Sequence, residues 1–493
     1  MKTLLPATAL AAMALTACAI GPNYKRPQTP APAAYREDQG WKPANPGQIS
    51  ADQPWWSIYA DPVLDGLERQ VEVSNQSLKA AEAAYRSARA AVDVDRGSLL
   101  PDISLTGGAT RSGGSGTLVQ SGVSVGGTGG HRTSFSAGAQ GSWILDVWGR
   151  IRRTIESDSA RAQASAADVA AARLSAQVLL AEDYFQLRAA EQQRRLYQSS
   201  IEAFQASLQI AQNRVKAGVT TVADVYSAQT ELENTQAQST SVLLTRAKLE
   251  HAIDVLTGRT PEDLTIDDGP LTATVPVVPA GVPSDLLQRR PDVSAAERSV
   301  ASTNALIGVA EAAWFPSLTL NGSIDYTSGI FEGLLGAHNA VWSFGPQLAE
   351  TVFNGGTRLA QTRAARANYD QAVANYRETV LSAFQQVEDN LSSLRVLEQQ
   401  AQLQDTAVSD ARRSEQLTLN QYKAGVADYA TLLTSQTTRL SSEISALSIQ
   451  SQRLVSSVEL ISALGGGWST AQLARADTRA DAHASVGATP GSP

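Results

Sequence analysis

The same four residues, Lys-Ala-Gly-Val, occur twice in this chain, at 216–219 and again at 423–426. Gly425 follows Gly218 by 207 positions, and the surrounding sequence keeps this offset without a gap over about eighty residues. Similarity at one fixed offset is the signature of an internal repeat. The chain must therefore build the same supersecondary unit twice.

A long helical pattern precedes each Lys-Ala-Gly-Val corner. The segment from about 150 to 217 contains no Gly or Pro, and at 1.5 Å per residue it predicts a helix about 100 Å long. A second such segment runs from about 357 to 424. Gly218 and Gly425 are suited to cap these helices, since glycine adopts the left-handed conformation that ends a helix. Each corner is thus predicted to be the tip of an antiparallel helix hairpin.

Two shorter regions alternate between apolar and polar residues, which is typical of strands. They predict one strand hairpin at about 102–145 and another at about 317–349. In the second, Leu318, Leu320 and Ile324 share one face. Four strands are too few to close a barrel, which needs about eight. Several chains contributing four strands each would solve this problem; a soluble antiparallel coiled-coil protein with a small β-sandwich remains open at this point.

The N-terminus is typical of a secreted lipoprotein. Lys2 and an apolar run precede Leu-Thr-Ala-Cys, which resembles a bacterial lipobox and predicts lipidation of Cys18. Cys18 is the only cysteine, so no intrachain disulfide can form. No second run of 18 apolar residues follows it. The net charge of −8 argues against a nucleic-acid partner.

These patterns divide the chain into six parts. They are a signal peptide at 1–17, a lipidated extended segment at 18–61, repeat 1 at 62–258 with its tip at 216–222, a Pro-rich connector at 259–283, repeat 2 at 284–468 with its tip at 423–429, and a disordered tail at 469–493.

Catalysis finds no support in the sequence. The four histidines, His131, His251, His338 and His483, are far apart, and none has metal-ligand spacing. No nucleophile elbow or phosphate-binding loop stands out. We therefore expect neither an enzyme nor a cofactor nor a bound metal.

Several stretches resemble the outer membrane factor family of the TolC and OprM type, in its lipoprotein branch. They are LTAC at 15–18, GPNYKRP at 21–27, PWWSIYADPVLDGL at 54–67, VPSDLLQRRPDVSAAE at 282–297, WFPSLTLNG at 314–322 and the two KAGV corners. The resemblance covers nearly the whole chain, to about Trp468. Of the charges in these stretches, we assign Arg289, Arg290 and Asp292 to structure.

The resemblance implies an α+β membrane protein. Three chains would form a 12-stranded outer-membrane β-barrel, with four strands per chain, continuous with a long periplasmic α-helical barrel. It implies a passive exit duct for small toxic compounds, as in multidrug resistance. A periplasmic adaptor and an inner-membrane pump, driven by protons, would be its partners. Two alternatives stay open: a duct for type I protein or peptide secretion, and a non-conducting structural envelope lipoprotein.

The resemblance also places the functional residues at the helix tips. The tips would dock the adaptor, and polar contacts beside them would hold the duct closed. The docking candidates are Lys216, Ala217, Gly218, Val219, Lys423, Ala424, Gly425 and Val426. The gate candidates are Asp224, Tyr422, Asp428, Thr431 and Thr434. Asp224 lies three residues after Thr221, so a helix-capping role competes with a gating role.

Overall fold

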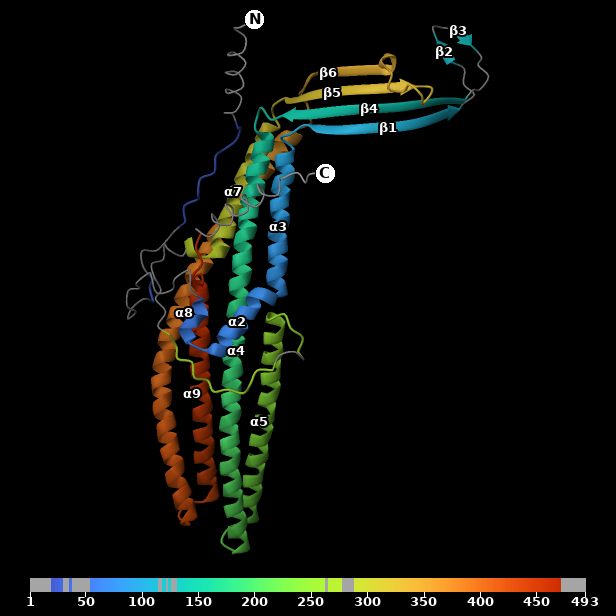
Figure 1. Cartoon of the computed structure of the whole chain (residues 1–493). Helices are drawn as coiled ribbons and strands as arrows, with labels where there is room; N and C mark the ends of the chain where they lie inside the picture. Colours follow the sequence, from blue (N-terminus) through green and yellow to red (C-terminus); the bar gives the residue numbers. More distant parts are fainter. Residues whose placement is uncertain are drawn as a thin grey trace. The chain divides into compact units, whose positions relative to one another are not determined.

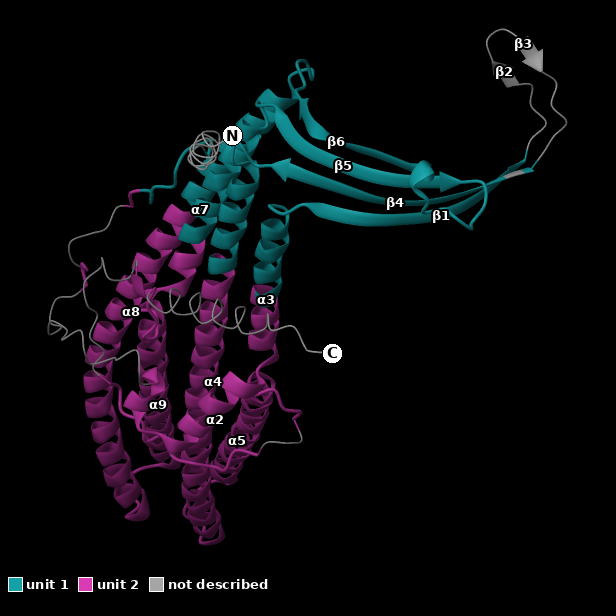
Figure 2. Ribbon diagram, turned by 45° about the horizontal axis from the view of Figure 1, so that its top comes forward, with its two compact units in different colours: residues 1–27, 86–163, 297–375 teal, residues 28–85, 164–296, 376–493 magenta. Residues whose placement is uncertain are grey.

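The computed structural model describes residues 19–29, 35–37, 54–113, 118–120, 123–125, 131–261, 265–276 and 288–470. The predicted signal peptide, Cys18 and the predicted tail beyond Thr470 lie outside these residues, as does part of the connector. The chain forms two compact units (Figure 2). Unit 1 comprises residues 1–27, 86–163 and 297–375, and unit 2 comprises residues 28–85, 164–296 and 376–493. Each unit thus draws on both repeats.

Unit 1 contains an antiparallel four-stranded sheet in the order β1-β4-β5-β6 (Figure 1). Its strands are β1 (Asp102–Gly113), β4 (His131–Leu145), β5 (Ser317–Ser328) and β6 (Ala340–Ala349). β1 and β4 form one hairpin, β5 and β6 the other, and the β4–β5 pairing joins the two repeats. The short strands β2 (Leu118–Gln120) and β3 (Val123–Val125) lie between β1 and β4 in sequence and pair with each other.

The register gives the sheet one apolar and one polar face. Residues directly opposite each other in an antiparallel pair share a face. Leu320 lies opposite Trp143 in β4 and Ile324 lies opposite Trp342 in β6, so their apolar side chains gather on one face. On the other face, Asn321 donates to Gln347 at 3.1 Å. The apolar face remains largely open in the single chain, since Trp342 is exposed.

The residues after Cys18 are fixed within unit 1. Ile20 donates its backbone N–H to Trp148 O, and Arg153, which is buried, donates to the carbonyls of Ile20 and Gly21 at 3.0 Å each. Gly21 adopts φ +100°, and a Cβ there would lie only 2.4 Å from Gly308 Cα. This close approach of two backbones requires glycine. The segment is therefore anchored by main-chain contacts, and the side chains of Asn23, which accepts from Arg153, and Tyr24, which donates to Glu297, add to them.

Unit 2 is helical, and its long helices lie side by side in pairs, α4 with α5 and α8 with α9 (Figure 1). These helices are α4 (Arg150–Lys216), α5 (Val222–Leu256), α8 (Thr357–Lys423) and α9 (Tyr429–Ala463); the shorter elements of the chain are η1 (Trp55–Tyr59), α2 (Pro62–Ser74), α3 (Gln76–Gly97), α7 (Pro291–Ala312) and η2 (Ala337–Asn339). In the core, Tyr59 contacts Phe185 with ring centroids 4.9 Å apart and hydrogen-bonds to Ser457.

Two features of the N-terminal third were not expected from the sequence. Within the segment 18–61, predicted as extended, Trp55–Tyr59 form a 3₁₀ helix whose Trp55, Trp56 and Tyr59 side chains are buried. The residues that follow form two helices, α2 (Pro62–Ser74) and α3 (Gln76–Gly97), which are separated at Asn75. The side chain of Asn75 caps α3 through Leu78 N and donates to Leu256 O, and such local bonds compete with helix continuation.

Candidate functional site: the paired helix tips and the connector network

The two Lys-Ala-Gly-Val tips have the same backbone geometry. Gly218 has φ +70° and Gly425 has φ +78°. In the first tip Val219 N donates to Arg214 O, and in the second Val426 N donates to Gln421 O, both at 2.9 Å. This bond spans five residues and satisfies a helix-terminal carbonyl. Nothing lies within 4 Å of a Cβ added at either glycine, so the backbone conformation, not crowding, requires glycine.

The tips expose apolar side chains. Val219 is 64% exposed and Val426 is 79% exposed. The other predicted docking residues, Lys216, Ala217, Gly218, Lys423, Ala424 and Gly425, are exposed as well. Small and apolar groups at a helix end leave room for a second helix end to approach closely. The tip surface is thus open in the single chain, as a docking surface must be.

A cluster of aromatic and basic side chains joins the two hairpins just behind the tips. The guanidinium carbon of Arg214 in α4 lies 4.7 Å from the ring centroid of Tyr422 in α8. Its Nη1 atom donates to Tyr422 O at 2.9 Å. Tyr422 also contacts Tyr429 of α9, with ring centroids 6.0 Å apart. We call Arg214, Tyr422 and Tyr429 the tip latch.

Burial shapes the chemistry of the tip latch. Tyr422 and Tyr429 are buried, and neither hydroxyl hydrogen-bonds to any group in the described part of the chain. Burial raises the pKa of both phenols above the ordinary value, so both stay neutral near pH 7. The latch therefore holds one cation against the neutral ring of Tyr422, which packs in turn on Tyr429, and the cation–ring contact is worth about 1–2 kcal/mol where it is shielded from water.

The five gate candidates differ in their burial and in their hydrogen-bond partners. Asp224 is half-buried close enough to Tyr422 to act on its pKa, and it accepts a hydrogen bond from the Thr220 hydroxyl. Asp428 is exposed and caps α9, accepting from Thr431 N at 2.8 Å. Thr434 is exposed and donates to Ala430 O within its own helix. Tyr422 and Asp224 are thus brought together, whereas Asp428, Thr431 and Thr434 make local contacts.

The predicted capping box at Thr221 does not form. Thr221 occupies the N-cap position of α5 but makes no side-chain cap hydrogen bond. Asp224 bonds to the preceding hydroxyl of Thr220 instead. The capping carboxylate of the chain's two tips is Asp428, whose pKa is lowered because it accepts hydrogen bonds from Thr431. Arg214, the centre of the latch, was missed by sequence reasoning, although a basic residue in the last turn of a helix is a recognisable signal.

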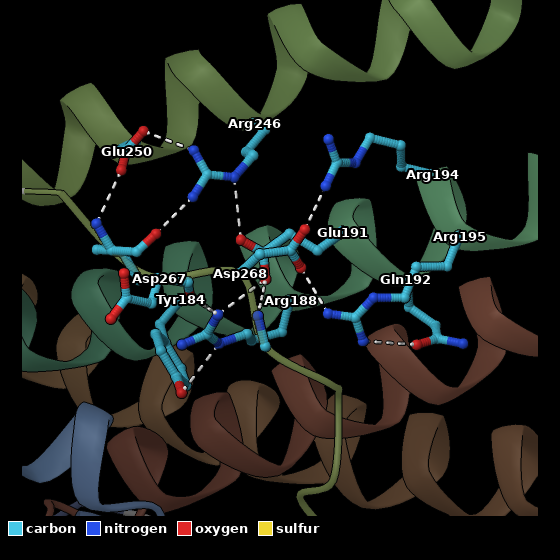
Figure 3. Close-up of polar contacts among 12 residues, drawn as sticks. Tyr184, Arg188, Glu191, Gln192, Arg194, Arg195, Arg246, Glu250, Asp267 and Asp268 are labelled. Carbon is cyan, nitrogen blue, oxygen red and sulfur yellow. Dashed lines mark hydrogen bonds and ion pairs between the residues drawn. The ribbon is translucent and has the colours of Figure 1, made fainter. Parts of the chain in front are cut away.

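A second polar cluster, also missed, ties the connector to α4 and α5 (Figure 3). Glu191 is buried, and its carboxylate accepts from Arg188 Nη1 at 2.8 Å, Arg246 Nε at 3.0 Å and Gly269 N at 3.0 Å. Arg246 also donates a hydrogen bond to Glu250, and Arg188 donates one to Asp267 O. Arg194 and Arg195 both pair with Asp268. We call this set the connector network.

Near the start of α7, Arg290 donates two hydrogen bonds to the carboxylate of Asp292, at 3.0 and 2.6 Å. It also donates to Gln386 in α8 and to Ala463 O at the end of α9. Arg290 thus joins three helices. The structural role expected for this charged run agrees with these contacts.

The described residues contain no helix long and apolar enough to cross a membrane. They also contain no group of three or more His, Cys, Asp or Glu side chains arranged to hold a metal ion.

Two long helix hairpins joined behind their tips, together with a four-stranded sheet that has one apolar face, make up the architecture of an outer membrane channel. The model of the family described as outer membrane efflux protein matches residues 67–259 and 282–466. The chain belongs to this family. It is therefore an outer membrane protein of efflux, and its role is transport.

Known relatives and a solved structure agree with this assignment. The chain is 31% identical to the pyoverdine export outer membrane protein OpmQ of Pseudomonas aeruginosa, covering 91% of this chain and 96% of the relative. It is 29% identical to the toluene efflux pump outer membrane protein TtgC of Pseudomonas putida, covering 93% and 95%. The structure of the outer-membrane channel OprN matches with a TM-score of 0.83 at 31% identity, covering 92% of this chain and all of that one.

Proposed function

We propose that this protein is the exit duct of a tripartite efflux system, which carries small toxic compounds across the periplasm and the outer membrane. The observation that carries the proposal is the pair of exposed helix tips held together by the tip latch. A duct needs an end that can dock a partner and an end that can open, and the tips offer both. The named substrates of the relatives above, toluene and pyoverdine, are small molecules, which favours efflux over protein secretion.

The duct would assemble from three copies of the chain. In the described part of the chain, β1 and β6 are the outer strands of the sheet, each paired on one side only. Open edges invite pairing with another chain. Twelve strands from three copies would close a barrel with its apolar face toward lipid, and the helix hairpins would form the periplasmic tunnel. We include in this proposal the division of the chain into six parts, in which the two repeats supply the strands and helices of the duct.

An acyl anchor would hold the protein at the outer membrane. Ala19, the residue that follows Cys18 in sequence, lies against Gly149 where β4 ends and α4 begins. A lipid on Cys18 would then sit at the membrane end of the duct. Several acyl chains on one residue would make the anchor firm.

The partners would meet the duct at its tips. Val219 and Val426 would contact a periplasmic adaptor, and an inner-membrane pump, driven by protons, would supply the energy. The duct itself would act passively. The tip latch, with Asp224 beside it, would keep the two hairpins together until the adaptor separates them.

The latch makes a specific prediction for conductance in planar bilayers. Arg214→Ala removes both the ring contact and the hydrogen bond to Tyr422 O, together worth about 1–2 kcal/mol. We expect the open probability to rise about tenfold, since 1.4 kcal/mol corresponds to one decade. Tyr422→Phe should change little, because the latch uses the ring and the carbonyl rather than the hydroxyl.

Arg413→Ala is the matched control, because it removes an exposed arginine of α8 that lies outside the tip latch. If Arg413→Ala opens the channel as much as Arg214→Ala does, loss of a positive charge is the cause and the latch assignment is wrong. If the lipidated wild-type protein is a monomer that never conducts, the structural-lipoprotein reading replaces the duct. Deletion of the gene separates efflux from secretion. If export of small compounds is lost while protein secretion stays intact, the protein serves efflux.

A further inference from the structure

Unit 2 contains a cavity of about 840 Å³ among α4, α5, α8 and α9. A volume of roughly 300–1,000 Å³ is typical of sites for small organic ligands. The cavity lies well away from the tip latch: its lining on α4 runs from Gln186 to Gln193, whereas Arg214 lies near the end of that helix. It is therefore distinct from the tip latch and from the docking surface.

The cavity opens on the side of α4 that faces away from the connector. The connector network uses Arg188, Glu191 and Arg195 on α4. The cavity is lined on the same helix by Gln186, Ala189, Ala190 and Gln193. At about 100° per residue, Arg188, Glu191 and Arg195 lie on the opposite face of the helix from the cavity lining, while Arg194 of the network lies between the two faces. With the connector on the outside of the proposed duct, the cavity faces its interior.

The lining combines apolar and polar groups. Leu249, Val396, Leu397, Ile444, Leu447 and Val455 supply the apolar part. Serine and glutamine side chains supply neutral hydrogen-bonding groups. Such a mixture suits an amphiphilic molecule with an apolar body and a polar head.

Charge at the cavity has one sign. Glu459 is the single charged residue among those lining it. Glu182, one turn before Gln186, is close enough to interact with Glu459: burial first, and then Glu459 and Asp183, raise the pKa of Glu182 to about 7. None of these three carboxylates pairs with a lysine or arginine in the described residues, unlike Glu191 and Glu443 elsewhere in the unit. Burial also raises the pKa of Glu459, and that of Asp183 to about 6, so the negative charge of the groove becomes complete only above neutral pH. A groove with negative charge that no basic side chain compensates attracts cations.

We propose that this cavity binds amphiphilic organic cations on their way through the duct. The apolar side chains of α5, α8 and α9 would contact the body of the compound, and Glu459 would face its positive charge. This inference rests on the proposed function for the direction of traffic, but the cavity and its charge stand on the single chain. The inference names a class of substrate that the duct would bind during passage, rather than only allow to diffuse through.

The test is equilibrium dialysis of the purified full-length protein against two probes, tetraphenylphosphonium and the neutral, similarly shaped triphenylphosphine oxide. Wild-type protein should bind the cation saturably and more tightly than the neutral probe. Glu459→Gln should weaken cation binding about five- to tenfold, the contribution of one nearby charge in a partly solvated groove. Affinity for the neutral probe should stay the same. Ser448→Trp, which fills the cavity, should abolish binding of both.

Glu202→Gln is the matched control, since it removes an exposed glutamate from α4 outside the cavity. Equal cation affinity in wild type, Glu459→Gln and Ser448→Trp would overturn the proposal. So would a loss in Glu202→Gln as large as that in Glu459→Gln, because it would show a general charge effect. Circular dichroism checks that Ser448→Trp folds, and the charge variants test the site without changing its volume.

Conductance in bilayers separates this inference from the proposed function. A protein that conducts but shows no saturable cation binding keeps its role as a duct and loses this site. A protein that binds the cation as expected but never conducts keeps the site and loses the duct.

Discussion

Glu191→Ala lowers the free energy of unfolding of unit 2 by about 3–5 kcal/mol, the range observed when one partner of a buried ion pair is removed. Glu191 is buried, and it balances Arg188, whose side chain is 6% exposed, as well as Arg246. Without the carboxylate, two guanidinium groups remain with less compensation, and Gly269 N loses its acceptor. The connector, held there by these bonds, is expected to come loose first.

Thermal unfolding followed by circular dichroism in detergent measures the loss of stability, and limited proteolysis measures release of the connector. The internal repeat supplies a matched control. Glu398 is the residue 207 positions after Glu191, and it pairs with Arg453, which is 207 positions after Arg246. Its side chain is 49% exposed, so Glu398→Ala should cost only about 0–1 kcal/mol. Equal losses in the two variants would mean that burial of the connector network does not matter.

Glu68→Gln removes most of a pH dependence of stability that the wild-type protein should show. Glu68 in α2 is 0% exposed, and neither carboxylate oxygen has a hydrogen-bond partner in the described part of the chain. Burial, and then the charge of Glu72, raises the pKa of Glu68 to about 9 from an ordinary 4.5. The folded protein therefore keeps a proton that the unfolded chain loses above about pH 4.5.

The sign follows from this difference in bound protons. Stability from protonated Glu68 is fully present below about pH 4.5 and is lost as the pH rises toward 9. At up to 1.4 kcal/mol per pH unit, the wild type should lose about 4 kcal/mol between pH 5 and pH 8. Glu68→Gln should lose much less, because its amide does not titrate.

Melting temperatures at pH 5, 6.5 and 8 test this expectation, with Glu202→Gln as a control for an exposed glutamate of α4. The control should keep the slope of the wild type. Parallel pH profiles for wild type and Glu68→Gln would show that Glu68 is solvated or paired in the assembled protein.

The hairpin tips could be located from sequence because their cause is local. A glycine with positive φ at the end of an unbroken helical pattern leaves few alternatives. The tip latch could be located only in part. Tyr422 was recognised, but its partner Arg214 lies in the other repeat, 208 positions earlier. No local pattern indicates which distant side chain will lie over a given ring.

Capping shows the same limit on a smaller scale. Thr221 and Asp224 have the spacing of a capping box, yet the carboxylate of Asp224 accepts a hydrogen bond from the hydroxyl of Thr220 instead. Asp428, proposed for the gate, is the residue that caps its helix. In both cases competing hydrogen bonds within four residues decided the outcome, and spacing alone does not rank them.

The sequence by itself determined the repeat, the long helices, their glycine tips and the alternation of the strands, because each depends on residues close together in the chain. It also placed the pairs Glu191–Arg246 and Glu398–Arg453 at equivalent positions of the two repeats. Only the tertiary structure decided that Glu191 is buried beside the connector whereas Glu398 is half exposed, although Arg246 and Arg453 are about equally exposed, at 20% and 23%. The physical reason is that the connector bonds directly to Glu191 through Gly269 N, so equivalent charges acquire different surroundings.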